Sequence, residues 1–245
     1  MQALAQIEPM SSKDRAGPGR DRGFLLDQFY VRVDGCRLAV ADHGTGPCLV
    51  FLHGLSGNST HWVHVAPALT ATHRVICVDL PGCGNSERQA QGYTVKSYAD
   101  CVAGLLQALG IPRAWVIGHS LGGMVATDFG LRFPELSSGL VLVNPAGFQR
   151  FPAWMRLGSH LVFQEPLLNR VLPRTWKSLL AVVFQTKNAH TERFIQMVET
   201  THDDSDIFDM TRVMCSLRSD FVDTDHLDHL AMLKVPVHLI WGSKD

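Results

Sequence analysis

One turn constrains the fold of this chain more than any other stretch. An apolar run from Trp115 to Ile117 leads into Gly118-His-Ser-Leu-Gly122, and a helix-like segment follows from Met124 to Leu131. A strand, a G-x-S-x-G turn and a helix in this order are typical of a nucleophile elbow. The two glycines of the pattern permit a turn so tight that a Cβ at either position would strike the neighbouring strand or helix. The pattern therefore predicts a strained Ser120 that presents its hydroxyl group.

Other apolar runs alternate with helical patterns on both sides of this turn. A hairpin signal at Asp34-Gly35 precedes them, and Thr94 is placed to cap a helix that ends before Gly110-Ile-Pro112. Continuous apolar runs suit strands that are buried on both faces of a parallel sheet. The sequence therefore predicts an α/β fold, with a mostly parallel central sheet and helices on both faces. The strands are expected at 48–52, 74–78, 140–143 and 235–241, and the helices at 59–69, 94–109 and 227–233.

The segment after the fourth apolar run differs in character. It contains no clear strand, but it has many spaced large apolar residues and is broken by prolines. We expect residues 147–225 to form an inserted helical cap, with residues 24–146 and 226–245 forming the core. The polar residues 1–23, which include Gly17-Pro-Gly19, are expected to be a disordered leader.

Composition favours a globular protein with a sizeable core. Hydrophobic residues make up 46% of the 245 residues and charged residues 18%, with a net charge of −1. Without a run of like charges, we expect no nucleic-acid partner and no membrane partner. The six cysteines follow no metal or disulfide spacing, and no apolar stretch suits a signal peptide or a membrane span. We therefore expect a reduced, cytoplasmic protein. Oligomeric state stays open.

Several polar residues beside the motifs invite a functional interpretation. We expect His53, His119, Asp79 and Ser86 to shape loops instead. The histidine pairs His61/His64 and His226/His229 have i, i+3 spacing, but no third ligand accompanies either pair at ligand spacing. The sequence therefore predicts no metal site.

Four motifs together resemble the α/β-hydrolase fold. They are the strand into His53-Gly54, the segment Asp79-Leu-Pro-Gly-Cys-Gly-Asn-Ser86, the elbow, and the strand end Trp241-Gly-Ser-Lys-Asp245. More narrowly, the chain resembles capped serine esterases and carbon–carbon bond hydrolases. The resemblance implies that Ser120 is the nucleophile, that the backbone N–H groups of Leu55 and Leu121 form the oxyanion hole, and that Asp245 is the acid. Asn144 occupies the other position where relatives place the acid, and it cannot serve as a carboxylate.

The chain departs from the resemblance at its end. The family order is nucleophile, acid and then histidine, but nothing follows Asp245. The chain is either a truncated part of a longer enzyme or a natural remnant. We expect truncation, with the general base beyond residue 245 together with the last strand and helix. A truncated chain of this kind is expected to be inactive and to expose residues 235–241 as an apolar edge.

The resemblance implies a serine hydrolase that works through an acyl-enzyme, without a cofactor. Its expected substrate is a small apolar ester, or a ketone-type compound cleaved at a C–C bond next to the carbonyl. Two alternatives stay open. One is a catalytically dead binder of a small apolar molecule, and the other is a cofactor-free lyase or peroxidase-like relative.

Overall fold

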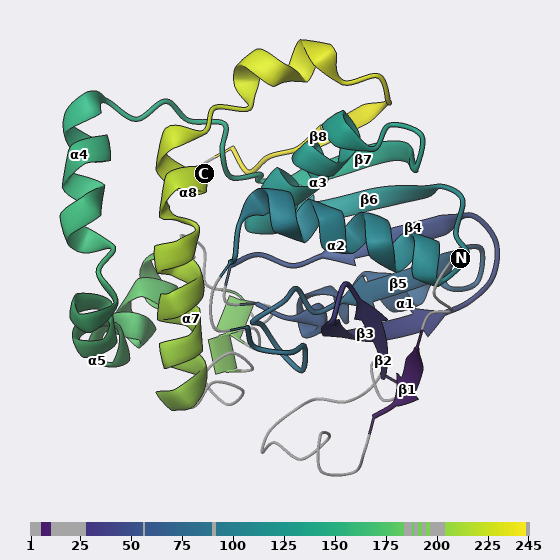
Figure 1. Ribbon diagram of the computed structural model, residues 1–245, viewed down its shortest axis with the longest axis horizontal. Helices are drawn as coiled ribbons and strands as arrows, with labels where there is room; N and C mark the ends of the chain where they lie inside the picture. The colour runs from purple at the N-terminus through teal and green to yellow at the C-terminus, as the bar shows by residue number, and fades with distance from the viewer. Residues whose placement is uncertain are drawn as a thin grey trace.

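The computed structural model describes residues 6–10, 28–55, 57–89, 92–183, 188, 191–192, 195–196 and 204–243. These residues form an eight-stranded sheet in the order β1-β2-β3-β5-β4-β6-β7-β8 (Figure 1). The strands are β1 (Ile7–Pro9), β2 (Phe29–Val33), β3 (Cys36–His43), β4 (Cys48–Leu52), β5 (Arg74–Val78), β6 (Ala114–His119), β7 (Ser137–Val143) and β8 (Val237–Ile240).

The sheet is antiparallel at one side and parallel through the rest. β1, β2, β3 and β5 pair antiparallel in succession, and β5, β4, β6, β7 and β8 then pair parallel. The chain crosses over between parallel strands through helices, which therefore cover the faces. The prediction of a mostly parallel sheet with helices on both faces is confirmed.

Side chains of the central strands alternate between two apolar layers. Val50 and Leu52 of β4 pack in the larger layer, under α2 (Val95–Ala108) and α3 (Leu121–Arg132). Phe51 points to the other face, where it packs with Trp62 of η1 (Ser59–Trp62) near α1 (Ala66–Leu69). Burial on both sides explains why these strands are continuous apolar runs.

Local sequence signals set the helix boundaries. The Thr94 side chain accepts a hydrogen bond from the Ser97 N–H, and the Ser97 hydroxyl in turn bonds the Thr94 N–H, which makes a capping box at the start of α2. The helix predicted for residues 59–69 is instead two short pieces, η1 and α1. Pro67 lies in the first turn of α1, where the backbone N–H groups have no acceptor within the helix. Inside a continuous helix over 59–69, Pro67 would remove a backbone hydrogen bond and its ring would clash with the carbonyl group one turn earlier.

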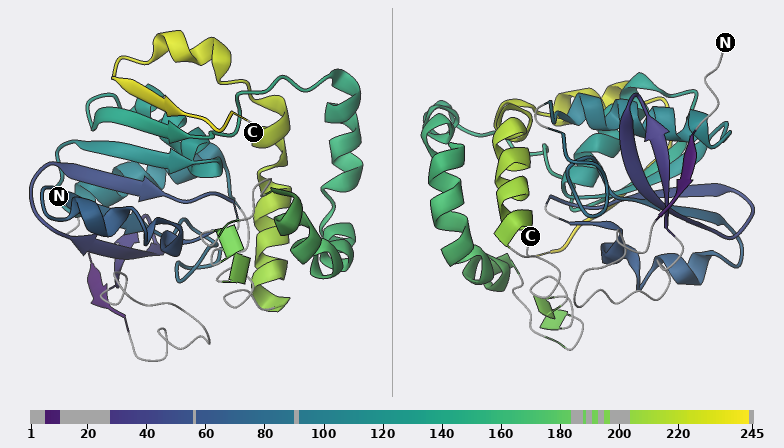
Figure 2. Two further views of the ribbon diagram at one scale, coloured as in Figure 1. Left: turned by 180° about the vertical axis from the view of Figure 1, so that it is seen from behind. Right: turned by 60° about the horizontal axis from the view of Figure 1, so that its bottom comes forward.

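A second group of helices lies to one side of the sheet (Figures 1 and 2). These are α4 (Ala153–Val162), α5 (Glu165–Val183), α7 (Asp204–Ser216) and α8 (Arg218–Asp223). They fall within residues 147–225, where the sequence favours helix; the part of that segment outside the described residues, and the division into domains, stay predictions. None of the described helices is both long and apolar enough to cross a membrane.

The last strand forms the edge of the described sheet. A 3-10 helix, η2 (Leu227–Met232), leads to β8, which pairs with β7 on one side only. Leu239 and Ile240 are 53% and 54% exposed, and Trp241, just after β8, is 47% exposed. The chain thus leaves an apolar strand open at this edge.

Candidate active site

The elbow between β6 and α3 has the strain that the sequence predicts. Ser120 has φ +51° and ψ −114°, a conformation that non-glycine residues rarely adopt. A Cβ on Gly118 would lie 2.1 Å from the Gly122 carbonyl oxygen, and a Cβ on Gly122 would lie 2.3 Å from that of Leu52. Both distances are far shorter than non-bonded atoms can approach, so only glycine fits at either position.

Backbone hydrogen bonds hold the strained serine from both sides. The Ser120 N–H donates to the Val143 carbonyl at 3.1 Å, and the Ser120 carbonyl accepts from the N–H groups of Gly123 at 2.9 Å and Ala146 at 3.0 Å. The end of β7 and the loop after it therefore clamp the elbow. Such a clamp offsets the unfavourable conformation and keeps the half-exposed serine in place.

Two backbone segments approach the Ser120 side chain, as an oxyanion hole requires. Leu121 is the first residue of α3, where N–H groups have no acceptor within the helix and the helix dipole favours negative charge. A Cβ on Gly54 would lie 3.3 Å from the Ser120 Cβ, so the loop that carries Leu55 passes directly beside the serine. The structure thus brings together Ser120, Leu121 and the Leu55 loop.

His53 and Asp79 organise this loop rather than face a substrate. His53 is fully buried; its Nδ1–H donates to the Gly54 carbonyl at 2.7 Å and its Nε2 accepts from the Leu80 N–H at 2.9 Å. Burial lowers the pKa of His53, so the ring is neutral and keeps this tautomer. Asp79 accepts from the N–H groups of Ser59 and Asn85 at 2.7 and 2.8 Å. Both side chains have the loop-shaping role expected from the sequence.

Ser86 and His119 also have neighbours that suit a structural role. The Ser86 hydroxyl donates to the Asp79 carbonyl and accepts from the Ala39 N–H at 2.8 Å. The His119 ring packs over Gly54, where an added Cβ would lie 3.0 Å from its Nδ1. A side chain at position 54 would therefore push the Leu55 loop away from the elbow.

Asp245, the expected acid, lies outside the described residues. The strand before it ends close to the elbow: the Asn144 N–H donates to the Ile240 carbonyl at 2.8 Å, and the Gly242 N–H donates to the Asn144 Oδ1 at 3.2 Å. Asn144 has φ +43° and joins the loops after β7 and β8.

No histidine among the described residues hydrogen-bonds to the Ser120 side chain. His226 lies near Met124 of α3. A Cβ added to Gly147 would be 2.7 Å from both the His226 ring and the Met124 side chain. Its ring is 3% exposed, and neither nitrogen has a hydrogen-bond partner in the part of the chain that the structure describes. Burial lowers the pKa of His226, which is consequently neutral at pH 7.

A cavity of about 590 Å³ opens beside the elbow, at the carboxyl ends of β7 and β8. Its floor includes Pro145 and Ala146, whose neighbour Asn144 follows β7, and its walls come from α4, α8 and Trp241. The lining carries no charged side chain, and its large members are Phe148, Phe151, Trp154, Met155, Phe163, Phe221 and Trp241. Most of the lining comes from residues 147–222, and its composition suits an apolar ligand.

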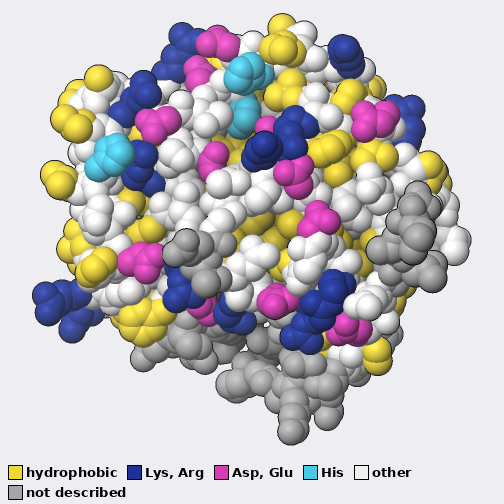
Figure 3. Space-filling view, viewed as in Figure 1, with side chains coloured by type: hydrophobic (Ala, Val, Ile, Leu, Met, Phe, Trp, Pro, Cys, Tyr) yellow, Lys and Arg dark blue, Asp and Glu magenta, His cyan; other side chains and the backbone are white. Residues whose placement is uncertain are grey.

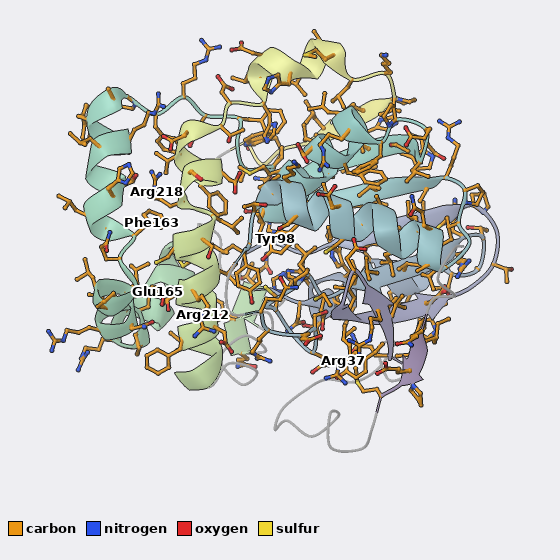
Figure 4. The ribbon with its side chains drawn as sticks, in the orientation of Figure 1. Arg37, Tyr98, Phe163, Glu165, Arg212 and Arg218 are labelled. Carbon is orange, nitrogen blue, oxygen red and sulfur yellow. The ribbon has the colours of Figure 1, made fainter. Side chains whose placement is uncertain are left out.

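Polar contacts hold the cavity walls together. Arg218 of α8 lies between α8 and α4 (Figure 4), and it donates to the Ser159 Oγ at 3.0 Å and pairs with Asp223 at 3.3 Å. Asp220 accepts from the Val95 N–H at 3.2 Å, so a residue of α8 caps the start of α2. Sequence reasoning missed these links because 59 and 125 residues separate the partners.

The histidine pairs His61/His64 and His226/His229 have the i, i+3 spacing of possible metal ligands. Among the described residues, no cluster of three or more His, Cys, Asp or Glu side chains could hold a metal ion. His226 and His229 lie with ring centroids 6.2 Å apart.

Comparison with known proteins agrees with the fold and the elbow. The sequence matches the alpha/beta hydrolase fold family over residues 47–245. With its parallel sheet, strained serine turn and glycine contacts, the chain belongs to this family.

Three relatives indicate the range of proteins around it. Over 233 residues the chain is 32% identical to a 2-hydroxy-6-oxononadienedioate/2-hydroxy-6-oxononatrienedioate hydrolase of Burkholderia vietnamiensis, covering 88% of this chain and 78% of that protein. It is 30% identical to a pimeloyl-[acyl-carrier protein] methyl ester esterase of Pseudoalteromonas atlantica, covering 82% and 77%. It is 40% identical to an uncharacterised protein of Mycobacterium tuberculosis over 130 residues, which are 53% of this chain and 38% of that protein. The chain thus spans well under half the length of this last relative.

Proposed function

We propose that this protein is a serine hydrolase that cleaves a carboxylic ester, or a C–C bond next to a carbonyl, through an acyl-enzyme on Ser120. The observation that carries the proposal is the strained elbow, which has φ +51° at Ser120 and two glycine positions that admit no side chain. Strain of this kind persists only where the surrounding structure enforces it, and it concentrates at functional sites.

In the proposed reaction, the Ser120 oxygen attacks the substrate carbonyl carbon and its proton passes to a histidine base. The carbonyl oxygen becomes an anion, which the N–H groups of Leu55 and Leu121 stabilise by about 3 kcal/mol each. The C–O or C–C bond then breaks, the leaving group takes the proton, and water hydrolyses the acyl-serine to release the acid. Asp245 is proposed to orient the histidine.

The proposed substrate is small and apolar, in keeping with the uncharged lining of the cavity. The relative from Pseudoalteromonas atlantica is named a methyl ester esterase, which supports cleavage of an ester. The relative from Burkholderia vietnamiensis is named a hydrolase of a 6-oxo dienedioate, which supports cleavage of a C–C bond next to a carbonyl. All six cysteines are free, and burial raises the pKa of Cys83 to about 12, which supports a reduced, cytoplasmic setting without a cysteine nucleophile.

The test measures hydrolysis of p-nitrophenyl butyrate by the protein expressed from its whole reading frame. Ser120→Ala should lower kcat by about 10⁴-fold or more, because no acyl-enzyme can form. Ser159→Ala removes a serine hydroxyl that lines the cavity beside the elbow and should keep kcat within about threefold. Turnover that survives in Ser120→Ala would remove the nucleophile assignment.

We also propose that the base is a histidine outside the described residues, which the family order puts after Asp245. Residues 1–245 alone should then show no ester turnover, because a serine hydroxyl without a base is a weak nucleophile. Ser120-dependent turnover by residues 1–245 would instead make a histidine of this chain the base. Binding of an apolar ester analogue without turnover, by the whole reading frame, would favour the binder alternative.

A further inference from the structure

Helix α4 carries apolar side chains on two sides, one of which faces the cavity, where Met155 and Val162 are still 39% and 53% exposed. Met155, Ser159 and Val162 line the cavity. Trp154, Leu157 and Leu161 follow the i, i+3, i+7 spacing of a different side of the helix, and they are 73%, 74% and 76% exposed. We call these three residues the outer stripe. A stripe of large side chains at such exposure is not the scattered surface hydrophobicity that every protein has.

Two further exposed apolar residues lie in the first turns of α5. Leu167 and Val171, one helical turn apart, are 44% and 40% exposed. Hydrophobic side chains accordingly stand out along the left edge of the molecule in Figure 3, over α4, with Lys and Arg side chains near them. Trp154 belongs both to the stripe and to the cavity lining, so the stripe reaches the cavity wall.

Basic residues flank this surface. Residues 152–178 contain Arg156, Arg170, Arg174 and Lys177 but only one acidic residue, Glu165, whereas the whole chain has a net charge of −1. Arg156 pairs with Asp223 at 3.0 Å, while Arg170 and Arg174 have no carboxylate partner among the described residues. Arg170 and Arg174 are exposed, so their positive charge can attract an anionic partner.

These features point to one occupant. A helix with Trp and Leu on one side and Arg beside them is suited to lie in the interface of a bilayer, where basic residues attract anionic headgroups. A second copy of this chain fits less well, because a two-fold contact places the same patch against itself and brings like charges together.

We propose that α4 and the first turns of α5 form a surface that binds anionic lipid bilayers. The proposal reverses the expectation of no membrane partner, which rested on the absence of a continuous basic run in the sequence. In residues 152–178 the basic residues are spaced among apolar ones, so the segment is basic without containing a run of like charges. The proposal does not depend on Ser120 or on any catalytic activity.

The test is co-sedimentation of the full chain with vesicles of equal parts phosphatidylglycerol and phosphatidylcholine, and with pure phosphatidylcholine vesicles. Binding should be strong only with the anionic vesicles and should weaken as salt rises. The double variant Leu157→Glu/Leu161→Glu should weaken binding by about tenfold or more, and Arg170→Glu/Arg174→Glu should weaken it on anionic vesicles. All these side chains are exposed, and the helical circular dichroism of each variant checks its fold.

Met232→Glu is the matched control, because Met232 is 63% exposed but lies on η2, away from α4. It should leave binding unchanged. The proposal is overturned if anionic vesicles do not sediment the wild-type chain at low salt, or if the Leu157→Glu/Leu161→Glu variant binds as the wild type does. A wild-type dimer that ignores vesicles, and that this variant converts to monomer, would identify a second copy as the occupant instead.

Discussion

At the scale of single residues, the site depends on positions where a side chain is forbidden. Gly122 lies where a Cβ would meet two carbonyl oxygens of the strand β4 and its following loop, at 2.3 and 2.7 Å. Its neighbour Ser120 keeps a positive φ because this close packing leaves it no other conformation. The chemistry proposed for Ser120 therefore rests on residues that touch no substrate.

Gly122→Ala should lower the free energy of unfolding by about 3 kcal/mol, because the clash is with backbone atoms that cannot move aside. The matched control is Gly158→Ala in α4, where a Cβ would meet nothing within 4 Å. That change should raise stability by about 0.5–1 kcal/mol, since alanine loses less backbone entropy in a helix. Urea unfolding measures both, and equal effects would contradict the steric account.

His226 provides a second residue-scale prediction. A buried histidine with a lowered pKa stays neutral in the folded state, while the unfolded chain takes up a proton below about pH 6.5. The unfolded state then binds more protons, so stability falls as pH drops through that range. The charge of Asp128 opposes this effect, but burial is the larger cause.

His226→Leu should therefore cost nothing at pH 7.5, because it replaces two unpartnered buried nitrogens with apolar atoms. Between pH 7.5 and 5.5 the wild type should lose more stability than the variant. His229→Leu, at a more exposed neighbouring position, serves as the control. A variant that unfolds much more easily at pH 7.5 would mean that the His226 nitrogens have a partner outside the described residues.

At the scale of elements, the sequence predicted the sheet better than the helices around it. The strands at 48–52 and 74–78 match β4 and β5, because burial on both faces leaves a continuous apolar run. The helix expected at 59–69 was wrong in detail, since Pro67 starts a new helix there. The outer stripe of α4 could not be predicted, because the sequence of an apolar helix does not tell which side is covered.

The edge strand β8 carries the element-scale prediction. Ile240 and its neighbour Leu239 are more than half exposed beside unpaired backbone groups, which makes the edge a site for association. Ile240→Lys should therefore reduce concentration-dependent aggregation of residues 1–245, as measured by light scattering. Val65→Lys changes an apolar residue of similar exposure, 49%, on the opposite side of the fold and should have little effect. Equal scattering by wild type and Ile240→Lys would remove the edge as the cause.

At the scale of the whole molecule, the site forms where segments far apart in the sequence meet. The motifs predicted the turn around Ser120 and the loop at Gly54, because both have local sequence signatures. The cavity had no such signature. Its wall joins Trp241 to Phe148, with ring centroids 6.4 Å apart, and only the folded chain brings that pair together.

The most direct test of the central claim is to identify the residue that becomes acylated. The protein expressed from its whole reading frame is treated with a fluorophosphonate, digested and analysed by mass spectrometry. The account predicts one adduct, on the peptide that contains Ser120, and loss of that adduct in Ser120→Ala. An adduct on Ser159 or another side chain, with Ser120 unmodified, would contradict the claim that Ser120 is the nucleophile.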